Sequence, residues 1–283
     1  MFVPMQKYIL LMACPDQPGI VARVTAVFYE AGANILALEQ HVEEQKLFFM
    51  RIEAEAENLP MEKLEALARQ LGGEITLRPK GERRRVAILV SQDGACAREL
   101  LAKQLTGELA METVLIISNN SDQRELAEAN GVQFEYVPTE RVIGGAHEDR
   151  MRQLLDAAKV DLVVLARYMK ILSPEFVEHF AGRMINIHHG FLPAFKGAQP
   201  YRQAWERGVK IIGATAHFVT AGLDEGPIIA QDVTRVTHQH SVAAMVATGR
   251  DIERRVLAEA VKAYLDDRIL QTGVRTIVFR QTD

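Results

Sequence analysis

The sequence lacks several features that would assign it to a specialised class of protein. Its 283 residues include only 2 cysteines, Cys14 and Cys96, which lie far apart in the chain. Two thiols form neither a disulfide framework nor, by themselves, a zinc cluster, so a reducing cytoplasm is expected. Neither sign of charge forms a long block, since 37 acidic residues accompany 33 basic ones. Nucleic acid is therefore not an expected partner.

Long hydrophobic runs are also missing. The N-terminal stretch is apolar, but it has no basic leader and stops at Asp16, which is too soon for a membrane span and unsuited to a signal peptide. We see no internal repeat and no low-complexity tract. What is present is ample apolar material, 48% of all residues, in a chain long enough for one large domain or two ordinary ones. We expect a globular protein without a membrane partner.

The first part of the chain alternates between strand and helix spacing. Strands are expected over residues 8–14, 35–42, 47–56 and 74–77. One helix is expected to start at Asp16, whose carboxylate can cap it, with Pro18 in its first turn and Gly32 as its stop; a second runs from Pro60 to Leu71. The order βαββαβ predicts a two-layer, ferredoxin-like α/β sandwich.

A polar segment at residues 79–84 contains both Pro and Gly and predicts a boundary between domains 1–80 and 81–283. The short basic cluster at residues 83–85 is interpreted as a solvated linker, with an anion-binding patch as the alternative. Beyond it, apolar runs alternate with helical stretches, which predicts a mainly parallel, Rossmann-like sheet. The expected strands are 86–90, 113–118, 162–165 and 184–187, and the expected helices are 96–106, 122–130, 147–158, 174–182 and 241–266. Runs 211–218 and 228–233 are expected to join the sheet as antiparallel strands.

The carboxyl end of strand 184–187 carries the residues best suited to chemistry. Side chains alternate along a strand, so Asn186 and His188 emerge on one side while His189 points to the other. A later glycine-bearing loop can bring Asp224 to the same sheet edge, where open α/β sheets bind ligands. An amide N–H can stabilise a developing oxyanion, a histidine can move a proton, and a carboxylate can stabilise the imidazolium.

Structural roles for the same residues are the alternatives at this point. Asn186 is also a common turn or capping residue, and Asp224 a common solvated turn residue. The pair His188-His189 does not reveal which imidazole matters, and His217 is interpreted as a structural neighbour. A metal site is disfavoured, because His147-Glu148-Asp149-Arg150 lacks the second histidine of an H-E-x-x-H motif.

Two longer strings carry a family resemblance. INIHHGFLPAFKGAQPY (185–201) and GATAHFVTAGLDEGPIIAQDV (213–233) resemble the folate-dependent formyltransferase superfamily, and most of all its hydrolytic branch, the formyltetrahydrofolate deformylases. Residues 8 to about 78 are similar to the ACT domain that this branch carries at its N-terminus. The resemblance implies hydrolysis of 10-formyltetrahydrofolate to formate and tetrahydrofolate, with folate as substrate and no further cofactor. It also implies a purpose in one-carbon metabolism: folate recycling and formate supply, for instance to purine synthesis.

The resemblance also assigns roles to residues. Asn186, His188 and Asp224 match the family's catalytic Asn, His and Asp, which selects His188 over His189. The pterin-binding segment corresponds to Arg167, Tyr168, Met169, Lys170, Ile171 and Leu172, and the opposite wall to Ala221, Gly222 and Leu223. Gly190 departs from the pattern, because the family usually has Ser there. Asn120-Ser121 replaces the usual His-Pro, and Gly94-Ala95-Cys96 lacks a common His.

Two other functions compete with hydrolysis. A transferase with a phosphorylated amine acceptor calls for a glycine-rich loop after the first catalytic strand, but Ser91-Gln92-Asp93-Gly94-Ala95 has one glycine and an acid where an anion would bind. A tRNA formyltransferase would need a further basic domain. A non-catalytic amino-acid sensor is the alternative from a different class.

The ACT-like domain predicts an effector site. Asp16, Gln17, Gly19 and Ile20 present backbone N–H groups at a helix start, a natural seat for a carboxylate, and Asn34 resembles the effector-contacting Asn of ACT domains. The alternative is a purely structural role, in which Asp16 only caps the helix and Asn34 only turns the chain. The resemblance implies control by a small amino acid such as glycine or methionine, and a homo-oligomer, dimer or tetramer.

Overall fold

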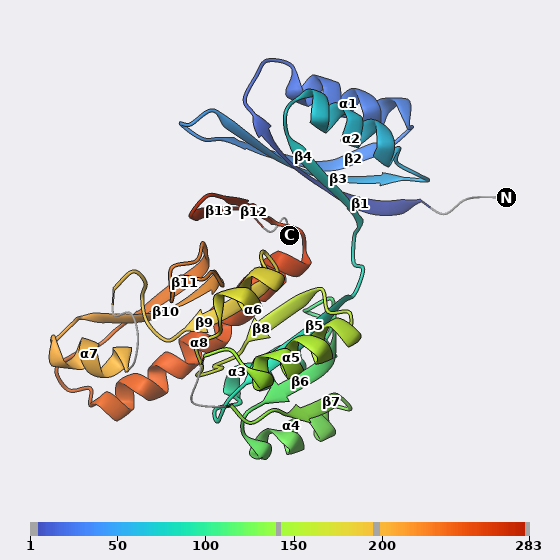
Figure 1. Cartoon of the computed structure of the whole chain (residues 1–283). Coiled ribbons are helices and arrows are strands. Elements are labelled where there is room, and N and C mark those ends of the chain that lie inside the picture. The colour runs from blue at the N-terminus through green and yellow to red at the C-terminus, as the bar shows by residue number, and fades with distance from the viewer. Residues whose placement is uncertain (1–4, 140–142, 195–198, 281–283) are drawn as a thin grey trace. The chain divides into compact units, whose positions relative to one another are not determined.

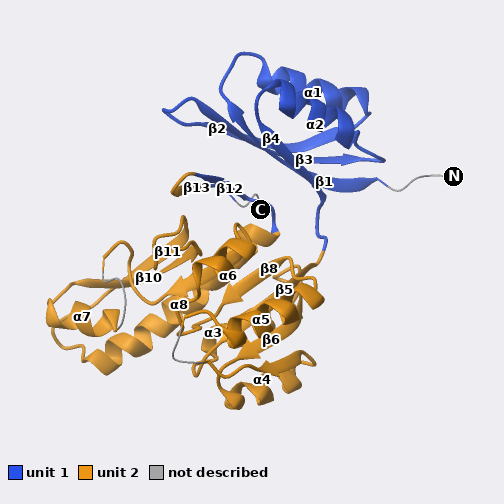
Figure 2. Cartoon of the chain, in the orientation of Figure 1, with its two compact units in different colours: residues 1–82, 266–272, 277–283 blue, residues 83–265, 273–276 orange. Residues whose placement is uncertain are grey.

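The computed structural model describes residues 5–139, 143–194 and 199–280. The chain divides into two compact units (Figure 2). Unit 1 comprises residues 1–82, 266–272 and 277–283, and unit 2 comprises residues 83–265 and 273–276. The division after Glu82 falls inside the polar segment at residues 79–84. The C-terminal segments differ from the expected assignment of 81–283 to one domain, because Phe279 packs against Leu11 and Phe49 within unit 1.

Unit 1 has the βαββαβ order expected from the sequence. Its elements are β1 (Gln6–Pro15), α1 (Ile20–Glu30), β2 (Asn34–Val42), β3 (Leu47–Ala56), α2 (Met61–Gln70) and β4 (Glu74–Pro79). The strands form an antiparallel sheet in the order β2-β3-β1-β4, and both helices lie on one face of it (Figure 1). The core between these layers includes Leu10, Met50 and Phe28, each at most 1% exposed. This two-layer arrangement is that of an ACT-like domain.

The start of α1 corrects one prediction. The helix begins at Ile20 and its N-cap is Gly19, with φ +88° and no side-chain capping hydrogen bond. Asp16 does not cap it; its backbone N–H donates to Lys46 O instead (2.7 Å). Pro18 accordingly precedes the helix, because the left-handed turn at Gly19 redirects the chain after the proline. The expected stop at Gly32 is confirmed by its φ of +67° directly after the helix.

Unit 2 contains a sheet of seven strands in the order β11-β10-β9-β8-β5-β6-β7. The strands are β5 (Arg84–Val90), β6 (Met111–Ser118), β7 (Gln133–Tyr136), β8 (Leu162–Leu165), β9 (Met184–His188), β10 (Ile211–Phe218) and β11 (Ile228–Arg235). The five from β5 to β9 pair in parallel, and β10 and β11 are antiparallel additions as expected. The sheet core is formed by fully buried aliphatic side chains such as Ile88, Ile116 and Val164.

Helices flank this sheet (Figure 1). They are α3 (Ala95–Leu105), the 3-10 turn η1 (Ser121–Gln123), α4 (Arg124–Ala129), α5 (Ala146–Ala157), α6 (Pro174–His179), α7 (Pro200–Glu206) and α8 (Val242–Leu265). Two short strands, β12 (Ile269–Thr272) and β13 (Arg275–Val278), pair with one another. The described part of the chain contains no helix long and apolar enough to cross a membrane.

Candidate active site

The carboxyl ends of β8 and β9 open into a cavity of about 280 Å³. Asn186 and His188 lie two residues apart on β9, and both line this cavity. Antiparallel pairing with β10 places His217 opposite Asn186 and Thr215 opposite His188. The loop that follows β10 then brings Asp224 into the same cavity. The structure thus brings the predicted Asn, His and Asp together from two chain segments, β9 and the loop after β10, and adds His217 from β10.

Asp224 lies between the two imidazoles. Its Oδ2 is 3.2 Å from His188 Nδ1, and its Oδ1 is 3.8 Å from His217 Nε2. The Asp224 side chain is only 9% exposed, so the ion pair with a protonated His188 is largely shielded from water. The Asp224 backbone has φ +54°, which is in the left-handed region of the Ramachandran plot. This conformation costs a non-glycine residue on the order of 1–3 kcal/mol and is common at functional sites.

His217 fixes the orientation of the Asn186 amide. Its Nδ1 donates a hydrogen bond to the Phe218 carbonyl (2.8 Å), and burial lowers the pKa of this histidine, so its ring is neutral. Nε2 is then an acceptor, and Asn186 Nδ2 lies 3.2 Å from it. The amide nitrogen, rather than the amide oxygen, is therefore the atom held toward His217. The linear sequence missed this role, since only the β9–β10 register places the two residues opposite one another.

His189, the neighbour of His188, has a different environment. Burial, with help from the positive charge of Arg167, lowers its pKa to about 4. Its ring centroid lies 6.1 Å from that of Tyr201 and 5.5 Å from that of His188. Although His189 also borders the cavity, it is neutral near pH 7 and is not within ion-pair distance of a described carboxylate.

Gly190 approaches the His188 ring closely. A Cβ placed on Gly190 would lie 2.8 Å from His188 Nε2 and 3.2 Å from Pro200 Cβ. The first distance is shorter than real Cβ contacts, so any larger residue must push the imidazole aside. The glycine in place of the family's usual Ser therefore leaves the His188 ring room that a side chain would take.

The predicted substrate walls line the same cavity as Asn186, His188 and Asp224. They are Arg167, Tyr168, Met169, Lys170, Ile171, Leu172, Ala221, Gly222 and Leu223. Side chains such as Met169, Ile171 and Leu223 are more than half exposed, which provides apolar surface for a flat ring. The backbone of the first wall is pinned to Ser91, whose N–H donates to Arg167 O (3.3 Å) and whose Oγ accepts from Met169 N–H (3.0 Å).

The predicted effector residues of unit 1 make local contacts. Gln17 Nε2 donates to Leu71 O (3.2 Å), and Asn34 Nδ2 donates to Glu55 Oε1 (3.2 Å). The side chain of Ile20 packs in the core at 2% exposure. Ile20 can consequently offer an effector only its backbone N–H, as can Gly19. A carboxylate seat at the start of α1 stays a prediction.

Metal binding has little support in the geometry. Within residues 5–139, 143–194 and 199–280, no three or more His, Cys, Asp or Glu side chains are grouped so that they could hold a metal ion.

Comparison with known proteins defines the family. A formyl transferase family model matches residues 84–261, and an ACT domain model matches residues 8–68. A formyltetrahydrofolate deformylase of Bacillus subtilis (strain 168) is 45% identical over 278 residues, covering 95% of this chain and 93% of the relative.

Two solved structures extend the comparison. A formyltetrahydrofolate deformylase from Pseudomonas syringae has a TM-score of 0.94 at 38% identity, covering 99% of this chain and 96% of the other. Glycinamide ribonucleotide transformylase 1 from Symbiobacterium toebii has a TM-score of 0.67 at 32% identity, covering 72% of this chain and 98% of the other. The molecule is thus an enzyme of the formyltransferase fold that also carries an ACT domain. The chain belongs to the formyltetrahydrofolate deformylase family, whose members are hydrolases.

Proposed function

We propose that the chain hydrolyses 10-formyltetrahydrofolate to formate and tetrahydrofolate at the cavity that contains Asn186, His188 and Asp224. The observation that carries this proposal is the convergence of these three side chains with both predicted folate walls on one cavity. The family to which the chain belongs supports the same substrate.

The chemistry follows from the positions of the polar groups. A water molecule attacks the formyl carbon and gives up a proton to His188, while an Asn186 N–H stabilises the negative charge that develops on the formyl oxygen. Asp224, 3.2 Å from His188 Nδ1, stabilises the imidazolium. The C–N10 bond then breaks as His188 returns the proton to N10, which yields tetrahydrofolate and formic acid, ionised to formate at neutral pH. No covalent enzyme intermediate is required.

Formyl transfer to an amine and a non-catalytic sensor remain the alternatives. Hydrolysis predicts formate release from the purified chain without any amine, and one oxygen-18 atom per formate in labelled water. His188→Ala is the matched control, because it removes the proton relay and leaves the apolar walls in place. Formylation of an added amine without formate release would favour the transferase. Absence of both products, with amino-acid binding intact, would favour the sensor.

Regulation is the second part of the proposal. We infer that a small amino acid binds with its carboxylate at the start of α1, where Gly19 and Ile20 provide N–H groups without side-chain capping. The ACT domain supports this, and the chain is proposed to act as a homo-oligomer, dimer or tetramer. Titration of glycine and of methionine against formate release tests it. Flat responses to both would contradict regulation, and sizing by light scattering would contradict the oligomer if only monomer were found.

A further inference from the structure

A second cavity lies next to the catalytic one. It has a volume of about 830 Å³ and is bordered by the loop of residues 91–94 and by Arg250 of α8. It shares Arg167, Met169 and Lys170 with the catalytic cavity, so the two spaces adjoin at the first folate wall. Of the described residues that line the second cavity, Arg98, Arg167, Lys170 and Arg250 are positively charged and Asp93 is negatively charged. Such a surface is suited to an anion.

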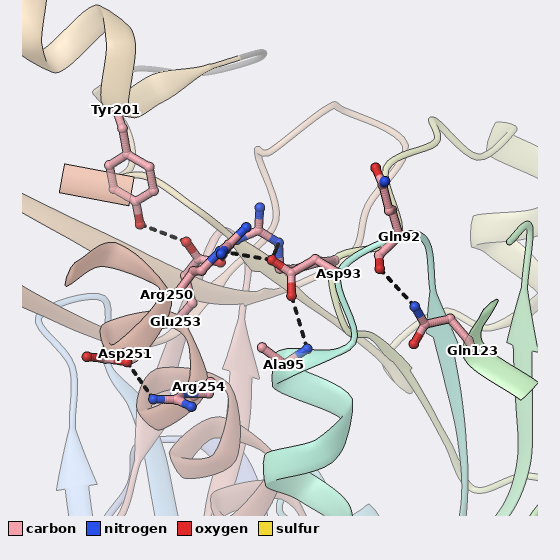
Figure 3. A network of polar contacts seen from close by, with 10 residues as sticks. Gln92, Asp93, Ala95, Gln123, Tyr201, Arg250, Asp251, Glu253 and Arg254 are labelled. Atoms are coloured by element: carbon pink, nitrogen blue, oxygen red, sulfur yellow. Dashed lines mark hydrogen bonds and ion pairs between the residues drawn. The ribbon is translucent and has the colours of Figure 1, made fainter. Parts of the chain in front are cut away.

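The anion at this position is supplied by the chain itself. Asp93 Oδ1 accepts a hydrogen bond from the backbone N–H of Ala95 (3.1 Å), the first residue of α3 (Figure 3). Its Oδ2 lies 3.0 Å from Arg250 Nε and 3.7 Å from Arg167 Nε. A helix N-terminus flanked by two guanidinium groups is the arrangement that binds phosphate in many proteins, and here a carboxylate occupies it.

The surrounding contacts hold this arrangement in place. Gln123, only 4% exposed, donates from Nε2 to Gln92 O (2.8 Å) (Figure 3). A Cβ on Gly94 would lie 2.4 Å from Gln123 Oε1. The loop therefore cannot move away without losing a buried hydrogen bond. On the other side, the Arg167 guanidinium pairs with Glu253, which is fully buried.

We propose that Asp93 is a specificity-determining residue, which fills the anion seat of the second cavity and thereby excludes phosphorylated molecules from the space beside the catalytic centre. A phosphate group would have to displace the Asp93 carboxylate from Ala95 N–H and Arg250. The negative charge of that carboxylate would also repel the phosphate. Phosphorylated amine acceptors are thus kept out, and water is left as the acceptor. This inference rests on the proposed hydrolytic function.

The experiment asks whether removal of Asp93 uncovers a phosphate site. Asp93→Ser removes the charge, opens space and keeps an oxygen that can accept from Ala95 N–H. Asp93→Asn removes only the charge. Inorganic phosphate is titrated into the full-length protein by calorimetry, and its effect on thermal unfolding is recorded. We expect Asp93→Ser to bind phosphate roughly tenfold or more tightly than the unmodified protein, as recovery of one charge-assisted hydrogen bond implies, with Asp93→Asn between them.

Asp251→Asn is the matched control, because Asp251 lies next to Arg250 on α8 but pairs with Arg254 (Figure 3). It removes the same charge from the protein and should leave phosphate binding and formate release as they are in the unmodified protein. The proposal is overturned if all variants bind phosphate equally. It is also overturned if a folded Asp93→Ser and a folded Asp93→Asn bind no more than the unmodified protein. Formate release by the unmodified protein is measured separately, so a failure of the hydrolytic function is distinguished from a failure of the anion seat.

Discussion

The catalytic cavity and the second cavity adjoin at the same edge of the sheet but are built differently. The walls of the catalytic cavity are largely apolar, and in it the imidazoles of His188 and His217 lie beside the carboxylate of Asp224. In the second cavity, the carboxylate of Asp93 lies beside the guanidinium groups of Arg167 and Arg250. Histidine changes its protonation near neutral pH, whereas arginine stays charged. The imidazoles of the catalytic cavity can therefore relay protons. The guanidinium groups of the second cavity can only stabilise the structure and select ligands.

The largest effect is expected from the catalytic cavity. His188→Ala should lower kcat by roughly 10²–10⁴ and Asn186→Ala by roughly 10²–10³, because the first removes proton transfer and the second an oxyanion donor. Formate release under saturating folate measures both. His189→Ala is the control and should retain most of the activity. An inactive His189→Ala beside an active His188→Ala would show that the wrong imidazole was chosen.

Substitution of Glu253 should act on stability before it acts on turnover. Glu253 is 0% exposed, pairs with Arg167 and accepts a hydrogen bond from Tyr201 Oη (2.8 Å). Glu253→Ala removes the close ion pair of Arg167 and leaves it only the more distant Asp93 carboxylate, so it should lower the free energy of unfolding by roughly 3–5 kcal/mol. The only tryptophan, Trp205, belongs to unit 2, so its fluorescence in urea reports this unit.

Glu253→Gln is the informative companion variant, since it keeps the volume and the Tyr201 contact but removes the charge. We expect a smaller loss than for alanine. Equal stability of Glu253→Ala and the unmodified protein would contradict a structural role for the Arg167–Glu253 ion pair.

Acid should weaken unit 2 through His189. Its pKa is lowered from 6.5 to about 4 by burial, so the unfolded chain binds a proton that the folded chain rejects. The stabilisation is complete above pH 6.5 and is lost as the pH falls toward 4, by on the order of 3 kcal/mol at most. His189→Gln should flatten this part of the pH dependence of unfolding, whereas the exposed His238→Gln should not. A slope unchanged by His189→Gln would exclude this explanation.

The smallest effect is expected at Gly190. Gly190→Ala adds the Cβ that would lie 2.8 Å from His188 Nε2, and the displaced ring should lower kcat by roughly tenfold. Gly190→Ser tests in addition whether a hydroxyl offsets this loss. The exposed Ala181→Ser serves as the control for a serine elsewhere in the unit. Unreduced turnover in Gly190→Ala would mean that the ring has more room than the contact implies.

Much of the fold follows from local sequence. The buried strands β3 and β8 have the predicted bounds, because β8 is a continuous apolar run and β3 follows a polar turn and begins with four apolar residues. The strand β7 and the helix α7 were not predicted, since each is short and lacks a periodic apolar pattern. The C-terminal strands were missed because their residues Leu270 and Ile277 pack against a cluster that contains Leu11, from the opposite end of the chain.

The candidate site was predictable to a similar degree. Alternation along β9 is a local property, so the pairing of Asn186 with His188 on one side could be read from the chain. His217 and the ion pairs of Arg250 could not, because they depend on strand register and on helix packing across many residues. The effector site, the oligomer and the cytoplasmic location stay predictions.

The register between β9 and β10 has a consequence for how the enzyme is handled. The contact between His217 and Asn186 depends on this register, which places the two residues opposite one another. A slip by one residue would turn every side chain of a strand to the other face while leaving the backbone ladder, and hence the far-ultraviolet circular dichroism, nearly the same. For refolded protein, the fraction of active molecules should therefore be measured by active-site titration. A preparation with a native circular dichroism spectrum can still contain inactive molecules.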